Sequence, residues 1–207
     1  MRLQGYDYTR AGLYFLTIVL QNRLRLFGQI ENGKMFLNDA GKMVEKWYCE
    51  IENKFPDKRC REMVVMPDHF HCIIENMDIP GTNQDTRFSP RDAHEEASLR
   101  GRLCVRGRRK NVIRTENKKS TIFKNKYGLH NKKYRATIGD VMEWFKTMTT
   151  NEYIRGVKTN NWRRFDRKLW QRNYYDHIIR NVSEYKRIAA YIINNPAKGN
   201  DDKSQSE

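Results

Sequence analysis

Long apolar runs are missing from this 207-residue sequence. The longest, residues 13–20, falls far short of the ~20 residues that a membrane-spanning helix needs. The N-terminal segment MRLQGYDYTR has no apolar run behind its positive charge, so a signal peptide is not expected. The four cysteines form no C-x-x-C pair, which argues against a zinc knuckle or a disulfide framework and favours reduced thiols. These absences predict a cytoplasmic protein that contacts no membrane.

Acidic residues are few relative to basic ones. The chain has 40 Lys and Arg against 25 Asp and Glu, which gives a formal net charge of +15. A protein this basic attracts polyanions, and nucleic acid is the commonest of them. Apolar residues make up 38% of the chain and charged residues 31%. This balance indicates a folded body joined to a stretch that adds little to the core.

One stretch, residues 78–135, carries most of the positive surplus. It holds 16 Lys or Arg and 6 Asp or Glu, so it accounts for +10 of the +15. A connection of this length without a sustained apolar period is usually functional or disordered. We interpret it as a flexible basic insertion, either a solvated linker or an arm that embraces DNA. It interrupts a single domain, residues 1–199, which a polar tail at 200–207 follows.

The remaining residues show strand-like and helix-like patterns. Short apolar or β-branched runs predict strands at 13–20, 27–30, 34–37, 62–66, 69–75 and 174–179. Asn32-Gly33 predicts a tight hairpin turn between the second and third of these. Three helices are expected with their capping residues: 39–53 after Asn38, 138–155 after Thr137, and a last one capped by Ser183 and stopped by Asn195-Pro196. Strands and helices that mix without strict alternation favour an α+β fold with a mostly antiparallel central sheet and flanking helices.

His69 and His71 stand two residues apart in a predicted strand. Side chains alternate between the two faces of a strand, so both imidazoles leave the same side, about 6–7 Å apart at the Cα level, while Phe70 enters the opposite, apolar face. Two neutral imidazoles at this spacing can bind one divalent ion. A pair of histidines that merely packs or faces solvent is the alternative, and the H-x-H pattern alone leaves both open.

The last predicted helix carries a phenol and an amide on one face. Tyr191 and Asn195 are four residues apart, at the margin of the apolar stripe and near Arg187. A tyrosine there is either a core residue whose hydroxyl reaches water or a nucleophile that a nearby cation activates. The amide oxygen of Asn195 could complete the coordination of such a cation.

Five stretches of the chain stand in the order in which a known family has them. They are GYDYTRAGLYFLTIVLQNRLRLFG (5–28), VVMPDHFHCIIE (64–75), TIGDVMEWFKT (137–147), WQRNYYDHIIRN (170–181) and YKRIAAYIINNPAKG (185–199). Together they resemble the single-tyrosine HUH transposases of bacterial insertion sequences and, more closely, the REP-associated tyrosine transposases. The stretches cover nearly all of the predicted ordered regions.

This resemblance implies an HUH endonuclease fold with a ferredoxin-like, or RRM-like, core, and it implies roles for single residues. His69 and His71 fall on the histidine pair that binds the catalytic Mg²⁺ or Mn²⁺. Tyr191 falls on the tyrosine that attacks a DNA phosphate and forms a 5′-phosphotyrosine link. Asn195 falls where the insertion-sequence enzymes usually have glutamine as third ligand, and Asp68 replaces a more frequent asparagine.

The resemblance also implies the partner: single-stranded DNA with hairpins or imperfect palindromes, cut and rejoined during transposition or recombination at the bacterial nucleoid. Family members act as monomers or dimers, so a monomer and a homodimer both stay open. Accessory or DNA-binding roles are expected for seven residues: His177, Tyr174, Tyr175, Arg187, Trp162, Arg163 and Arg164. Tyr174 and Tyr175 are neighbours in a predicted strand, so only one of them can reach the metal. Trp162 and Phe165 either stack on unpaired bases or pack against the sheet edge.

Three alternatives remain at this level. A domesticated protein would hold DNA hairpins without cutting them. A replication-type nickase would carry two nucleophilic tyrosines on its helix, where this chain offers Tyr185 and Tyr191. A metal hydrolase of RNA or small phosphoesters would need no tyrosine at all.

Overall fold

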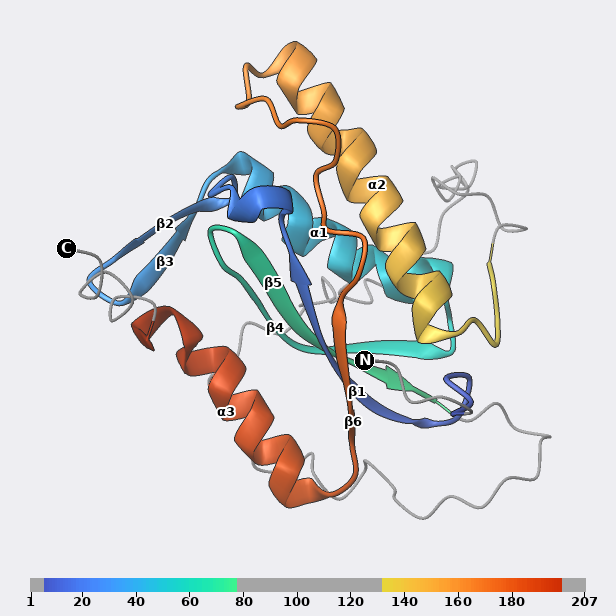
Figure 1. The fold of residues 1–207 in the computed structure, drawn as a ribbon. Helices are drawn as coiled ribbons and strands as arrows, with labels where there is room; N and C mark the ends of the chain where they lie inside the picture. Colours follow the sequence, from blue (N-terminus) through green and yellow to red (C-terminus); the bar gives the residue numbers. More distant parts are fainter. Residues whose placement is uncertain (1–5, 78–131, 199–207) are drawn as a thin grey trace, which may run out of the picture.

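The computed structural model describes residues 6–77 and 132–198. The elements in this part of the chain follow one another as Figure 1 shows. They are β1 (Gly12–Val19), a 3-10 turn (Gln21–Arg23), β2 (Gly28–Glu31), β3 (Lys34–Leu37), α1 (Asp39–Lys54), β4 (Lys58–Val65), β5 (His69–Asn76), α2 (Ile138–Thr159), β6 (Tyr175–Ile179) and α3 (Val182–Lys198). This is the predicted order, and the fold is α+β, as expected.

The main sheet has four strands in the order β4-β5-β1-β6, and each neighbouring pair is antiparallel. β2 and β3 form a separate antiparallel hairpin. Asn32 and Gly33 at its turn have φ of 49° and 70°, the left-handed values that a two-residue turn between twisted strands requires. The prediction of a mostly antiparallel sheet is confirmed.

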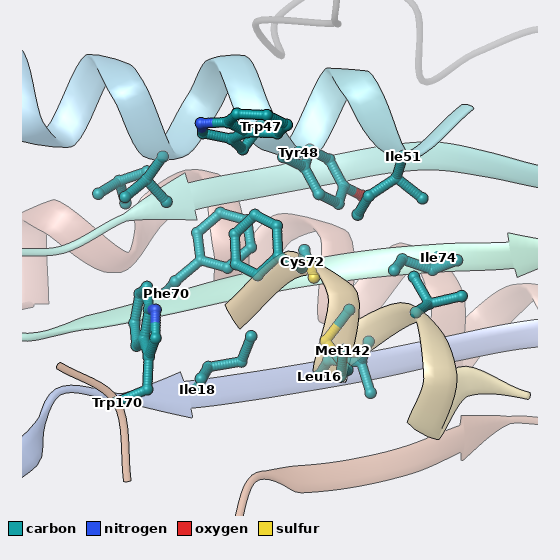
Figure 2. Packing of buried hydrophobic residues seen from close by; sticks show 14 of the residues in the cluster. Leu16, Ile18, Trp47, Tyr48, Ile51, Phe70, Cys72, Ile74, Met142 and Trp170 are labelled. Atoms are coloured by element: carbon teal, nitrogen blue, oxygen red, sulfur yellow. The ribbon is translucent and has the colours of Figure 1, made fainter. Parts of the chain in front are cut away.

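Helices cover both faces of the main sheet. α1 and α2 lie on one face, where Figure 2 shows side chains of β1 and β5 packed against them, among them Ile18, Phe70 and Cys72. α3 lies on the other face, on the opposite side of the sheet from α2 in Figure 1. It packs there with a smaller apolar cluster: Leu13, Phe15, Ile73, Ile179, Tyr185, Ile188, Ala189 and Ile192. The two central strands are therefore buried on both sides, which fixes their register.

Two of the three predicted helix caps are present. The Asn38 side chain accepts a hydrogen bond from the Gly41 N–H at 2.9 Å at the start of α1. At the start of α2, Thr137 and Asp140 form a reciprocal capping box. α2 ends at Thr159 rather than at residue 155.

The predicted limits of α3 are wrong at both ends. Asn181, not Ser183, caps the helix: its side-chain oxygen accepts the Glu184 N–H at 2.8 Å. The helix also continues past Pro196 to Lys198. Proline lacks only the N–H that would bond to the carbonyl of Ile192, and the last turn of a helix tolerates that loss.

β4 begins four residues earlier than its apolar run. The strand includes the charged segment from Lys58, whose ammonium lies 2.6 Å from the Asp57 carboxylate, both side chains being buried. Arg61 forms an ion pair with Glu75 on the neighbouring strand. Because Lys58 and Arg61 each have a carboxylate partner, a stretch without apolar character can form a strand.

Most of the predicted insertion, residues 78–131, lies outside the described residues, as does the tail. Its last residues are anchored: the Lys133 N–H bonds to the Lys54 carbonyl and the Arg135 N–H to the Asp57 carboxylate, each at 2.9 Å. The insertion therefore does not extend to residue 135 as predicted. None of the helices in the described part has the length and apolar character to cross a membrane.

The cysteines differ in state. Cys60 and Cys72 are buried free thiols, but Cys49 is disulfide-bonded. The expectation of reduced thiols throughout is thus wrong for Cys49.

Candidate active site

β5 presents His69 and His71 on one face of the sheet. Their ring centroids are 4.7 Å apart and their planes are inclined by 79°. Phe70, between them, is fully buried in the opposite cluster against α1 and α2. Strand alternation therefore placed all three side chains as predicted.

Each imidazole is held through its Nδ1 atom. His69 Nδ1 lies 2.6 Å from Asp68 Oδ1, and His71 Nδ1 lies 2.7 Å from Oγ1 of Thr17, the residue opposite it on β1. Arg23 in turn lies 3.5 Å from the second oxygen of Asp68. Metal-binding histidines are characteristically held in this way, because a partner on one ring nitrogen directs the other to the metal.

The Nε2 atom of His71 is buried and has no hydrogen-bond partner among the described residues. Burial, with a smaller contribution from the neighbouring His69, lowers the pKa of His71 to about 3. The ring is therefore neutral at physiological pH, and neutral imidazole is the form that binds a metal. A buried nitrogen left without a partner is a feature that a bound ion would explain.

α3 brings Tyr191 to the histidine pair from the far end of the chain. Its ring centroid lies 5.4 Å from that of His71 and 6.2 Å from that of Phe15, which stacks on His71 at 5.6 Å. Tyr191 is 39% exposed, so it is open to a ligand on the solvent side. Two imidazoles and a phenol, 120 residues apart in the sequence, thus meet at one place.

Asn195 lies one turn beyond Tyr191 on α3, and it is buried. The described residues contain no group of three His, Cys, Asp or Glu that could hold a metal. An ion at the histidine pair would therefore need a ligand of another kind, and an amide oxygen is one that Mg²⁺ and Mn²⁺ accept. The two imidazoles fit a divalent ion, but Asn195 is not among the residues that line the pocket with His71 and Tyr191, where Asn194 stands instead.

A pocket of about 700 Å³ adjoins the histidine pair, between α3, β1 and β6. It is lined by Phe15, Thr17, His71, Tyr175, His177, Arg187, Ile188, Ala190, Tyr191 and Asn194. Sequence reasoning had not selected Phe15, Thr17 or Asn194. Alternation along β1 places Phe15 and Thr17 on the histidine face, but only the strand register shows which residues they meet.

The accessory residues of β6 and the residue just before it, Tyr174, divide between the two faces. Tyr175 and His177 line the pocket, and His177 Nε2 lies 2.7 Å from Glu184 Oε1 on α3. Tyr174 packs with the cluster on the other face, where the Lys146 ammonium lies 5.3 Å from its ring centroid. The expectation that only one of the two tyrosines reaches the site agrees with these positions.

Tyr185, the other tyrosine of α3, is buried. Its hydroxyl donates to the Glu62 carboxylate, whose oxygens lie 2.7 and 2.9 Å away. Burial, followed by the negative charge of Glu62, raises the pKa of Tyr185 well above its ordinary value. Such a phenol is a poor nucleophile, which disfavours the nickase alternative with two tyrosines.

Trp162, Arg163 and Arg164 are not brought to the pocket. They lie on the segment that runs beside α2, on the side of the sheet away from α3 (Figure 1). Trp162 is half-buried against Gly156 and meets the Tyr153 ring edge-on at 5.2 Å. Phe165 meets the same ring at 5.5 Å, so both aromatics pack on α2 instead of facing bases or the sheet edge.

Comparisons with known proteins give one relative and one solved structure of interest. An uncharacterized protein of Haemophilus influenzae is 33% identical over 196 residues, which cover 95% of this chain and 86% of the relative. The structure of a REP-associated tyrosine transposase bound to a REP hairpin is similar with a TM-score of 0.52 and 16% identity, over 96% of this chain and 74% of that one. No model of a known protein family matches the chain.

Proposed function

We propose that this protein cuts and rejoins single-stranded DNA. The chain belongs to the family of the Haemophilus influenzae protein and has the fold of a REP-associated tyrosine transposase. The observation that carries the proposal is the contact of Tyr191 with His71, with ring centroids 5.4 Å apart. The solved transposase is bound to a DNA hairpin, so a hairpin or imperfect palindrome is the proposed substrate. A bacterial nucleoid is the location that fits such a substrate.

A divalent ion, Mg²⁺ or Mn²⁺, would be held by His69, His71 and the amide of Asn195. The chemistry that such an ion supplies is charge stabilisation on the scissile phosphate. Asp68 and Thr17 keep the two imidazoles oriented through their Nδ1 atoms. The Nε2 atoms are thereby left for coordination.

Tyr191 is the proposed nucleophile. Its Oη forms a bond to phosphorus while the bond from phosphorus to the 3′-oxygen breaks. The phenol loses its proton, the departing 3′-oxygen gains one, and the products are a 5′-phosphotyrosine and a free 3′-hydroxyl. Attack by a 3′-hydroxyl on the phosphotyrosine runs the same step backwards, so rejoining needs no ATP.

The test is formation of a covalent complex. A single-stranded hairpin oligonucleotide labelled at its 3′ end is incubated with the protein and Mg²⁺ or Mn²⁺, then separated under denaturing conditions. We expect a labelled protein adduct with the unmodified protein, and none with Tyr191→Phe or with EDTA. Tyr185→Phe is the matched control, because this phenol lies on the same helix but is buried against Glu62; its adduct should persist.

Three outcomes would contradict the proposal. An undiminished adduct with Tyr191→Phe would show that another residue is the nucleophile. A hairpin that shifts in a native gel but never becomes linked to the protein would identify a binding protein that does not cut. Cleavage that survives Tyr191→Phe without any adduct would favour the metal hydrolase alternative.

A further inference from the structure

The pocket beside Tyr191 extends well past the histidine pair. In the register of the sheet, His71 on β5 lies opposite Thr17 on β1, and Thr17 lies opposite Tyr175 on β6. The three residues therefore form one row across adjacent strands, and all line the pocket. Because neighbouring strands are about 4.8 Å apart, Tyr175 stands roughly 10 Å from His71 at the backbone level. That span is of the size of one nucleotide.

The row ends at an open edge of the sheet. β6 is the outermost strand, next to β1 alone, and its Tyr175 ring is 52% exposed. Its ring centroid lies 6.2 Å from that of Phe15, with the two planes inclined by 68°, so the exposed ring is held by a neighbour in the sheet. An exposed aromatic ring beside a pocket is a group on which an unpaired base stacks.

Polar and cationic groups stand on the helix side of the same pocket. Arg187 and Asn194 of α3 line it, and Arg187 is largely exposed although its guanidinium lies 3.7 Å from Glu184. Glu184 also holds His177, at 2.7 Å, which fixes the imidazole at the pocket wall. An aromatic wall opposite a guanidinium and an amide suits a ligand that has both a base and a phosphate.

The other aromatic side chains that reach the surface do not form such a site. Trp162 and Phe165 are partly buried and pack on α2, away from the pocket. Phe36 and Tyr134, 52% and 56% exposed, do not line the pocket. The supported ring of Tyr175 is thus the one whose position in the sheet connects directly to the proposed reaction site.

We propose that this pocket holds the nucleotide adjoining the scissile phosphate, unstacked from the strand, with its base against Tyr175 and its far phosphate toward Arg187. The inference rests on the proposed function, because that function places the scissile phosphate at Tyr191. It adds that one base next to the cut is bound individually by the protein and contributes to the choice of cleavage site.

The test couples an abasic scan of the DNA to substitution of Tyr175. A series of hairpin oligonucleotides, each lacking one base, is titrated by fluorescence anisotropy against protein in a Tyr191→Phe background, which prevents cutting. Tyr175→Thr removes the ring but suits a strand, and Tyr175→Phe keeps the ring. Tyr134→Ala is the control for loss of an exposed tyrosine elsewhere, and thermal unfolding verifies that each variant is folded.

We expect one abasic position, adjoining the mapped cut, to weaken binding about tenfold, as loss of one stacked base does. Tyr175→Thr should cost a similar factor with intact DNA and nothing further with that abasic DNA, while Tyr175→Phe and Tyr134→Ala should bind as before. The shared loss identifies the base that meets the ring.

The inference would be overturned if Tyr175→Thr and the missing base weakened DNA binding independently at every position. It would also be overturned if Tyr175→Thr were coupled to a base distant from the cut. In both cases a Tyr191-linked adduct would leave the proposed function standing. Coupling of one base to Tyr175 without any covalent adduct would have the opposite meaning: it would support the nucleotide pocket and contradict the proposed cutting activity.

Discussion

Replacing Gly156 by alanine should destabilise the protein, although alanine is the better helix former. Gly156 lies in α2, and the indole of Trp162 rests directly on it. A Cβ built on Gly156 would lie 2.6 Å from Trp162 Cζ3 and closer still to Cε3 and Cδ2. Ordinary carbon contacts begin near 3.4 Å, so either the ring or the helix has to move.

The ring cannot move alone. The backbone N–H of Trp162 donates to the Gly156 carbonyl at 3.3 Å, and the indole packs edge-on against Tyr153 with ring centroids 5.2 Å apart. Overpacking of this kind costs about 1–3 kcal/mol, whereas Gly to Ala inside a helix contributes about 1 kcal/mol in the opposite direction. We expect a net loss of about 1 kcal/mol in the free energy of unfolding.

Urea unfolding followed by tryptophan fluorescence measures this difference. Asn151→Ala is the matched control, because this exposed position in the same helix gains helix propensity without meeting the indole. The control should be as stable as the parent or slightly more stable. If Gly156→Ala gains stability to the same extent, the indole does not pack on this glycine and the reasoning is refuted. The DNA adduct should form in either variant, since Trp162 does not line the pocket.

Two further predictions concern the carboxylates of Asp68 and Asp140. Asp68→Asn should weaken Mn²⁺ binding about tenfold in a calorimetric titration, because loss of a charged partner of a ligand imidazole lowers metal affinity about 10- to 100-fold. Asp166→Asn, at an exposed position, is the control. Equal Mn²⁺ affinities of the two variants would contradict the role of Asp68 in orienting His69. Hydrogen bonds from Thr137 and Lys133 lower the pKa of Asp140 from 3.8 to about 2. A depressed carboxyl pKa stabilises the fold above the unfolded value and loses that effect as pH falls through the folded value. Asp140→Ala should therefore lower the free energy of unfolding by about 1 kcal/mol at pH 7. This difference from the parent protein should shrink between about pH 4 and pH 2. A constant difference over that range would assign the loss to helix propensity instead.

The sequence is sufficient for the local part of the fold. Alternation and helical spacing depend only on neighbours, so the strands around Phe70 and the starts of α1 and α2 are where the pattern predicts them. The start of α3 was predicted wrongly for a physical reason. At α3 two side chains, Asn181 and Ser183, were both chemically able to cap, and the choice between them depends on how β6 leads into the helix.

The candidate site is less accessible to such reasoning. The H-x-H spacing predicts that two imidazoles share a face, but nothing in it predicts Thr17 as the partner of His71. That contact arises from the pairing of β1 with β5, which is non-local. The same holds for Tyr175, whose place in a row with His71 follows from the order of three strands that are scattered over the chain.

The alignment of His71, Thr17 and Tyr175 in one row depends on the apolar residues around them. β1 and β5 pair over eight consecutive positions, and they carry apolar side chains on both faces, Leu16 and Ile18 toward α1 and α2, and Leu13 and Ile73 toward α3. A slip by one residue would exchange the two faces, and a slip by two would move His71 away from Thr17. The polar residues that line the pocket lie at the margin of the apolar contact between α3 and the sheet. Packing on both sides of the sheet thus holds the imidazoles and the phenol at a fixed separation, which the proposed reaction at a single phosphate requires.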